Sequence, residues 1–199
     1  MRRIEDRKQK RKRIWMGIIL AAVMVSSIFG IIVGNQTQNL RYNDFKFEVG
    51  NDNKIYTKVE DGKYVGFRYL PGSLENITVP GEATTYLRDS NVLIMTFNPN
   101  YEKTYVLSYL ENIELEMANE LSNKYVVKAV TEESEAYTAF PILTCENATL
   151  QQPIIFFQIA ENTTTITMDG YCIILSSTET GFYALKDRLM FSYFGVMDG

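Results

Sequence analysis

The stretch VLIMTFNPNYEKTYVLSYLENIELEMANELSNKYVVKAVT, residues 92–131, decides the fold of this chain. VLIMTF at 92–97 is a short apolar run bounded by polar and turn residues, which is typical of a buried strand. YVVKAVT at 125–131 predicts a second strand, and a helical pattern lies between the two. A strand–helix–strand unit predicts a parallel pair joined by a right-handed crossover, and so an α/β (α+β) fold.

The helix between these strands is long and amphipathic. Asn98 is a good N-cap with Pro99 at the first helical position, and the helix is expected to run to about Ser122. Its apolar residues are spaced by three or four positions, as one buried face requires. They are Val106, Leu110, Ile113, Met117 and Leu121.

Acidic residues follow in two groups. The helix carries four glutamates mainly off the apolar stripe: Glu111, Glu114, Glu116 and Glu120. We interpret them as a solvated acidic face, which would also suit a basic partner. A loop after the second strand carries Glu132, Glu133 and Glu135. Because no ligand partner lies near them in the sequence, the pattern indicates a solubilising loop rather than a metal or acid–base site.

Three strands are expected before residue 71. FKFEV (45–49), KIYTKVE (54–60) and KYVGFRYL (63–70) are rich in aromatic and β-branched residues with partial alternation. Turn residues separate them at 50–53, and again at 61–62, where Asp-Gly favours a tight hairpin. The pattern predicts an antiparallel meander. Asn and Asp at 51–53 lack the spacing of a calcium loop and are interpreted as turn residues.

The last third of the chain adds strands and a helix. PIIFFQIA (153–160), TTITM (164–168) and YCIILSS (171–177) predict three strands, the last two joined as a hairpin, so that a mixed sheet results. A C-terminal helix is expected at about 180–194. It has more apolar surface than one buried face needs, which leaves two interpretations: deep packing against the sheet, or contact with a partner or a membrane surface.

An apolar stretch near the N-terminus predicts a membrane anchor. Residues 14–34, IWMGIILAAVMVSSIFGIIVG, contain 21 residues without a charge. A helix of that length covers about 31 Å, close to the thickness of a bilayer core. A cleaved signal peptide is the alternative, but its apolar region is usually shorter and ends in an A-x-A-like site. The predicted organisation is a tail at 1–13, a signal anchor at 14–34, a polar spacer at 35–42 and an exterior α/β domain at 43–199.

Charge sets the expected orientation. Residues 1–13 carry eight Lys or Arg against Glu5 and Asp6. The positive-inside rule then places the N-terminus in the cytoplasm and the C-terminal domain outside, with the basic tail near anionic headgroups. Without those residues the chain holds 12 basic and 22 acidic residues, a net charge of −10. An acidic exterior domain of this kind predicts no nucleic-acid partner.

One face of the predicted anchor consists of small residues four apart. They are Ala22, Ser26, Gly30 and Gly34. Such a ridge lets two membrane helices pack closely, so it predicts a homodimer or docking on another membrane protein. Small residues are common in membrane helices, and ordinary composition therefore remains the alternative interpretation.

The two cysteines, Cys145 and Cys172, are predicted to form a disulfide. They are the only cysteines of the chain, and the expected topology places both in an oxidising exterior. The bridge would close a loop of about 27 residues, worth roughly 3 kcal/mol. A redox role would need a CxxC pair or a reactive thiolate environment, and the sequence contains neither signal.

The segments FPILTCENAT (140–149), TITMDGYCIIL (165–175) and LKDRLMFSYFGVM (185–197), behind a basic tail and one span, carry a resemblance. The chain resembles a set of short archaeal single-pass membrane proteins of unknown function. The resemblance covers most of the chain, and its motifs are structural rather than chemical. It implies the same layout, with Cys145 and Cys172 paired, and it carries no activity.

Missing residue types limit the chemistry. The sequence has no histidine, which excludes Ser-His-Asp and Cys-His catalysis and His-ligated metals. It has no phosphate-binding loop of the G-x-x-x-x-G-K-[ST] type. No cofactor is expected, and only carboxylate chemistry remains for an enzyme. Four N-x-[ST] sequons, possible glycosylation sites of an exterior domain, occur at Asn35, Asn76, Asn147 and Asn162.

The sequence therefore predicts a membrane-anchored exterior domain that serves as an interaction or accessory subunit of a cell-envelope assembly. Two alternatives remain open. One is an envelope hydrolase that uses Asp or Glu, which would need a cleft with two inward carboxylates of raised pKa. The other is a ligand-binding ectodomain.

Overall fold

The computed structural model describes residues 15–19, 24, 40–59 and 62–198, in two units divided after Gln38. In the first unit, 15–19 and 24 are helical. None of the helices within these ranges is long and apolar enough to cross a membrane. The predicted tail (1–13), most of the predicted anchor with its face of Ala22, Ser26, Gly30 and Gly34, and the sequon at Asn35 lie outside the described residues.

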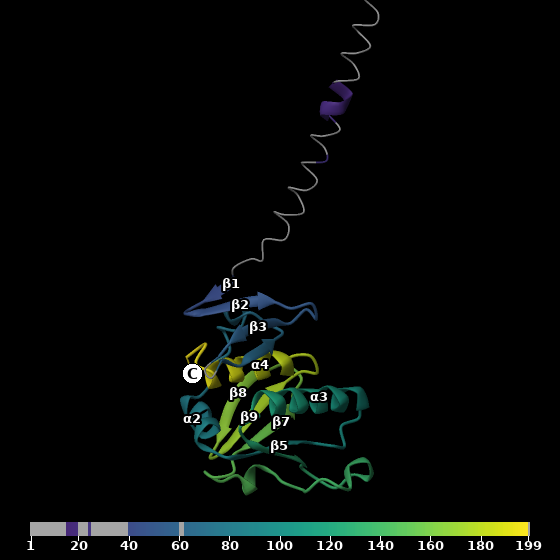
Figure 1. Cartoon of the computed structure of the whole chain (residues 1–199). Coiled ribbons are helices and arrows are strands. Elements are labelled where there is room, and N and C mark those ends of the chain that lie inside the picture. The colour runs from purple at the N-terminus through teal and green to yellow at the C-terminus, as the bar shows by residue number, and fades with distance from the viewer. Residues whose placement is uncertain (1–14, 20–23, 25–39, 60–61, 199) are drawn as a thin grey trace, which may run out of the picture. The chain divides into compact units, whose positions relative to one another are not determined.

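The second unit contains a five-stranded mixed sheet in the order β6-β5-β7-β9-β8 (Figure 1). β5, β6, β7 and β9 run parallel, and β8 is antiparallel to β9 at one edge. The predicted mixed sheet is confirmed, and so is the predicted parallel pairing of the strands at 92–97 and 125–130. The strands are β5 (Val92–Phe97), β6 (Tyr125–Val130), β7 (Ile154–Ile159), β8 (Thr164–Asp169) and β9 (Cys172–Ser177).

Three helices lie on one face of this sheet: α2 (Gly81–Asp89), α3 (Thr104–Glu120) and α4 (Phe182–Tyr193). The long helix was predicted to begin at Pro99, which is wrong. Asn98 instead accepts a hydrogen bond from the amide of Asn100 through its side chain, at 2.8 Å. This closes a turn after β5, and the chain enters α3 only at Thr104.

A second sheet of four strands is antiparallel throughout, as the meander prediction required. Its first strand was not predicted, because residues 40–42 were assigned to the polar spacer. These residues pair with the next strand, Leu40 opposite Phe47 and Tyr42 opposite Phe45. A strand of three residues has too little pattern of its own to be recognised. The strands are β1 (Leu40–Tyr42), β2 (Phe45–Val49), β3 (Ile55–Lys58) and β4 (Tyr64–Phe67).

α4 lies between the two sheets, as Figure 1 shows. Phe191 stacks on Phe67 of β4 with ring centroids 4.1 Å apart, and Phe182 packs edge-on against Phe157 of β7 at 6.0 Å. Both sides of the helix are therefore covered within the chain. Of the two interpretations of its excess apolar surface, deep packing is confirmed.

Burying α4 on both sides also buries its charges. Lys186 is fully buried, and its Nζ lies 2.7 Å from Glu120 Oε1, 3.0 Å from Asp187 Oδ1 and 3.5 Å from Glu116 Oε2. Asp187 Oδ2 accepts hydrogen bonds from two backbone amides beyond the end of β4, at 2.6 and 3.0 Å. This buried ion network therefore fastens the small sheet and α3 to the central helix.

The interpretation of the α3 glutamates as a solvated face is wrong for three of the four. Glu114 is fully buried, and the side chains of Glu116 and Glu120 are 19% and 11% exposed. For Glu116 and Glu120 the reason is that α4 and the small sheet cover their side of α3. Glu114 is buried on the side toward β6, where Lys128 is its nearest cation. Lys54 and Arg68 of the small sheet both contact Glu116, each at 2.9 Å.

The face of the large sheet away from the helices has its own small apolar cluster. Ile94, Ala129 and Ile154 lie in it, with Leu143 packed against them from the connection between β6 and β7. The structure pairs Cys145 of this connection with Cys172 of β9, with the Cα atoms 5.2 Å apart and 27 positions apart in the sequence. The predicted cysteine pair is present, and it ties the connection to the sheet.

Candidate functional site

The parallel strands end at one edge of the large sheet, and two surface hollows lie along that edge. From β5 the chain goes through α3 to β6 on one side, and it then returns to β7 on the other side of β5. The carboxyl edge of a parallel sheet where strand order reverses is the usual place for ligands in α/β proteins. This edge is therefore the first candidate for a site.

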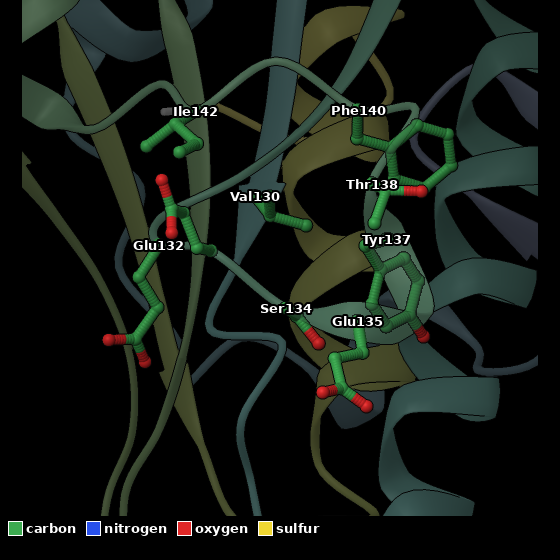
Figure 2. Close-up of a pocket in the computed structure, with 9 residues that line it drawn as sticks. Val130, Glu132, Ser134, Glu135, Tyr137, Thr138, Phe140 and Ile142 are labelled. Atoms are coloured by element: carbon green, nitrogen blue, oxygen red, sulfur yellow. The ribbon is translucent and has the colours of Figure 1, made fainter.

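The acidic hollow lies beyond the end of β6 and has a volume of about 460 Å³. Figure 2 shows Val130 between Ile142 on one side and Phe140 on the other, with Glu132 and Glu135 around them. It is thus an apolar hollow rimmed by carboxylates. Its lining is Val130, Glu132, Glu133, Ser134, Glu135, Tyr137, Thr138, Phe140 and Ile142.

Tyr137 fixes the wall of the acidic hollow to the core. Its ring packs edge-on against Phe97 at 5.4 Å and lies 5.6 Å from the ring of Phe140. Its hydroxyl donates a 2.5 Å hydrogen bond to Glu111 of α3. Burial, together with this bond to a carboxylate, raises the pKa of Tyr137 to about 12, so the phenol stays protonated as a donor.

Backbone contacts hold the rest of the hollow. The Val130 amide donates a hydrogen bond to the Pro141 carbonyl at 3.0 Å, and the Val130 carbonyl accepts one from the Leu143 amide at 2.9 Å. The wall of the hollow therefore continues the edge of the sheet. The Asn100 side chain donates to the carbonyl of Glu133 at 2.9 Å. The hollow is therefore built on ordered backbone rather than on a free loop.

The carboxylates at its rim have no cationic partner in the described part of the chain. Within residues 40–59 and 62–198, no salt bridge involves Glu132, Glu133 or Glu135. An apolar and aromatic wall under unpaired carboxylates suits a Lys or Arg side chain, whose aliphatic stem packs on apolar surface while its charged end stays at the rim. The solubilising interpretation of these residues from the sequence did not foresee the apolar wall, which comes from residues 137–142.

The switch-point hollow, beside the ends of β7 and β9, has a volume of about 530 Å³. Its lining includes Tyr101, Lys103, Glu161 and Glu179. Glu179 binds both Lys103 and the hydroxyl of Tyr105, and these hydrogen bonds lower the pKa of Glu179. The charges of this hollow are therefore largely matched within the chain.

A third hollow, of about 430 Å³, includes Glu120, whose pKa burial raises to about 7 although Lys186 opposes the rise. Its cations are engaged at helix ends. Lys63 donates to the last carbonyls of α3, and Arg88 donates to those of α4. Glu120 is the only carboxyl group with a raised pKa in this hollow's lining, so the acid pair that a hydrolase would need does not meet here.

Glu114 has the other strongly raised pKa on α3. Neither of its buried oxygens has a hydrogen-bond partner, and Lys128 Nζ lies 3.8 Å away. Burial raises its pKa from 4.5 to about 8. Because Glu114 lines none of these three hollows, we assign it no role in them.

Glu114 does predict a pH dependence of stability. Its folded pKa lies above its unfolded value, so the folded state holds more protons between pH 4.5 and 8, and stability should fall as pH rises through that window. One pKa unit corresponds to about 1.4 kcal/mol. Relative to the native chain, Glu114→Gln should therefore gain at least about 2 kcal/mol in unfolding free energy between pH 5 and pH 8. Denaturant titrations at both pH values, with the exposed Glu82→Gln as control, measure the difference; equal changes in both variants would contradict the assignment.

Three of the predicted glycosylation sites lie on the surface of the second unit. Asn76, Asn147 and Asn162 are exposed, and the side chain of Asn147 accepts a hydrogen bond from the Thr144 amide at 2.8 Å. No cluster of three or more ligating side chains within residues 40–59 and 62–198 could hold a metal ion. Glycosylation of the sequons stays a prediction.

The chain was compared with family models, curated proteins and solved structures, and none of them matches it. The resemblance to archaeal single-pass proteins therefore stays a prediction that rests on the sequence segments alone.

Proposed function

We propose that this chain is a membrane-anchored, extracytoplasmic interaction subunit of a cell-envelope assembly, and that its acidic hollow receives a Lys or Arg side chain of a partner protein. The observation that carries the proposal is the acidic hollow itself. Three carboxylates that form no salt bridge with any described residue rim an apolar wall, which Tyr137 and the sheet edge hold in place. The net charge of −10 beyond residue 13 adds long-range attraction for a basic partner.

The chemistry of the acidic hollow favours binding over catalysis. Its three glutamates come from one loop, and neither histidine nor a phosphate-binding loop exists in the sequence. A cationic side chain would gain packing on Phe140 and Ile142 and Coulomb attraction at the rim. A single exposed pair is worth little, so specificity would come from the wall and the three charges together.

A photo-crosslinking side chain tests this proposal in native membranes. Benzoylphenylalanine in place of Ile142, which is 49% exposed, should give a discrete adduct with one partner protein. Leu150, 45% exposed and just before the start of β7, is the matched control position and should give little adduct. Equal adducts at both positions, or none at Ile142, would contradict the proposal.

A second candidate function is a ligand-binding ectodomain. It is favoured by the position of the switch-point hollow beside the carboxyl ends of β7 and β9, at the edge where small ligands bind in open α/β sheets. Hydroxyl and charged groups of Tyr101, Lys103 and Glu179 suit a small polar molecule. Such a ligand would compete with the existing contacts between Lys103, Tyr105 and Glu179, which is why we rank this candidate second.

A further inference from the structure

Charge is divided unevenly between the two sheets of the second unit. Residues 40–70, which form the small sheet, hold six basic and five acidic residues. Residues 71–199 hold six basic and 17 acidic residues. The small sheet is therefore close to neutral on a strongly acidic body. Three of its cations, Lys54, Lys63 and Arg68, contact α3, which leaves Arg41, Lys46 and Lys58.

Three of these cations form one row across the sheet. Arg41 of β1 lies opposite Lys46 of β2, and Lys58 of β3 lies opposite Tyr64 of β4. The register of β2 and β3 pairs Phe47 with Thr57, which places Lys46 opposite Lys58. The row Arg41–Lys46–Lys58–Tyr64 thus crosses all four strands.

This basic row points away from α4. Phe47, Thr57 and Val65, the neighbours of Lys46, Lys58 and Tyr64 along their strands, are buried, and successive side chains of a strand alternate between faces. Tyr64 is 60% exposed. The outer face of the small sheet therefore presents cations with an aromatic ring, the combination found where proteins meet lipid headgroups.

Like charges opposite one another in a sheet are unfavourable without an anion nearby. Within residues 40–59 and 62–198, Glu48 is the one acidic partner of the basic row, 3.0 Å from Lys46, and no salt bridge involves Arg41 or Lys58. The row therefore carries an excess of positive charge that an anionic surface would neutralise.

The short connection between the predicted anchor and β1 indicates which anionic surface the basic row would meet. Only residues 35–39 separate Gly34, the end of the predicted anchor, from Leu40 at the start of β1. At about 3.6 Å for each residue, the chain can span at most roughly 20 Å between those points. An anchor at 14–34 would therefore keep β1 near the headgroups of the bilayer.

We propose that the outer face of the small sheet docks on anionic lipid headgroups through the basic row. This proposal rests on the membrane anchor in the proposed function. It adds a second binding surface, the outer face of the small sheet, with lipid headgroups as its partner. The loops between β6 and β7, drawn in green, lie at the end of the unit away from β1 and β2 (Figure 1). Docking would thus turn the acidic part of the domain away from the anionic membrane.

Lysine footprinting of the full chain in vesicles tests the docking. The native chain is reconstituted in phosphatidylcholine vesicles, with or without phosphatidylglycerol, and acetylated by an N-hydroxysuccinimide ester. Mass spectrometry then gives the labelling rate of each lysine. Lys103 is the internal control because it resembles Lys46 in two respects. Their side chains are 54% and 52% exposed, and each forms a salt bridge with a glutamate.

Lys46 and Lys58 should be labelled about fivefold more slowly in vesicles with phosphatidylglycerol, and high salt should remove the difference. Lys103 should react equally in both. Equal rates for Lys46 and Lys58, or the same slowing at Lys103, would overturn docking while leaving the anchor in place. A chain that fails to float with phosphatidylcholine vesicles would overturn the anchor, and with it the docking.

Discussion

Lys186→Met should lower the free energy of unfolding by about 3–5 kcal/mol at pH 8. The fully buried ammonium lies within 3.5 Å of Glu120, Asp187 and Glu116 at the centre of the buried ion network. Burial opposes its charge, but the attraction of Asp187 and Glu120 raises the pKa of Lys186 overall. Removing it leaves carboxylates together in a dry site, where their charge is poorly compensated.

The loss should be smaller at pH 5 than at pH 8. Without Lys186 the carboxyl groups take up protons more readily in the folded state, so the stability of the variant falls more steeply as pH rises. Lys103→Met, which removes an exposed pair with Glu179, is the matched control and should cost less than about 1 kcal/mol. Guanidinium titrations of the full chain in detergent measure both. A loss below about 1 kcal/mol for Lys186→Met, with no pH dependence, would show that the network is not a stabilising centre.

Replacing both cysteines, as Cys145→Ser with Cys172→Ser, should lower the unfolding free energy by about 3 kcal/mol. The bridge closes 27 positions and holds the β6–β7 connection on the outer face of the large sheet. For a domain of this size the loss corresponds to a fall in Tm of roughly 6–12 °C. Thermal unfolding in detergent, followed by circular dichroism, gives the shift.

Reduction supplies the control for the disulfide. Dithiothreitol should lower the Tm of the native chain by a similar amount and leave the double serine variant unchanged. If the reductant lowers the Tm of both proteins equally, or of neither, the pair does not act as a stabilising bridge.

Much of the fold could be predicted, because local pattern and tertiary environment agree. The run at 92–97, the hairpin strands of the meander and the pairing of Cys145 with Cys172 all follow from periodicity, turn residues or cysteine count. β1 could not be predicted, because three residues carry no period and gain their stability from pairing with β2. The start of α3 was missed because the Asn98 side chain caps a turn as readily as a helix.

The buried charges were missed for a different reason. Glu116 and Glu120 look solvated when α3 is considered beside one sheet only, whereas Glu114 is buried toward β6 of the large sheet itself. The overlooked signal is in α4, where the charged residues Lys186, Asp187 and Arg188 follow one another in a helix that is mostly apolar and buried. A helix covered by two layers must bury such residues, and buried charges need partners from neighbouring elements.

The acidic hollow could be predicted only in part. Glu132, Glu133 and Glu135 were recognisable as a cluster, but its meaning depended on what lies beneath it. The apolar wall forms because the chain returns at Pro141–Leu143 to pair with Val130, and that contact is tertiary. No local sequence pattern predicts this contact.

The central claim is that the acidic hollow binds a basic partner, and the crosslink from position 142 tests it most directly when combined with charge removal. The variant Glu132→Gln, Glu133→Gln and Glu135→Gln should reduce the adduct at least about fivefold. The control removes the same number of charges at exposed positions outside the hollow: Glu82→Gln, Glu102→Gln and Glu146→Gln. It should leave the yield unchanged. Equal yields in the two triple variants would contradict the claim that these carboxylates bind the partner.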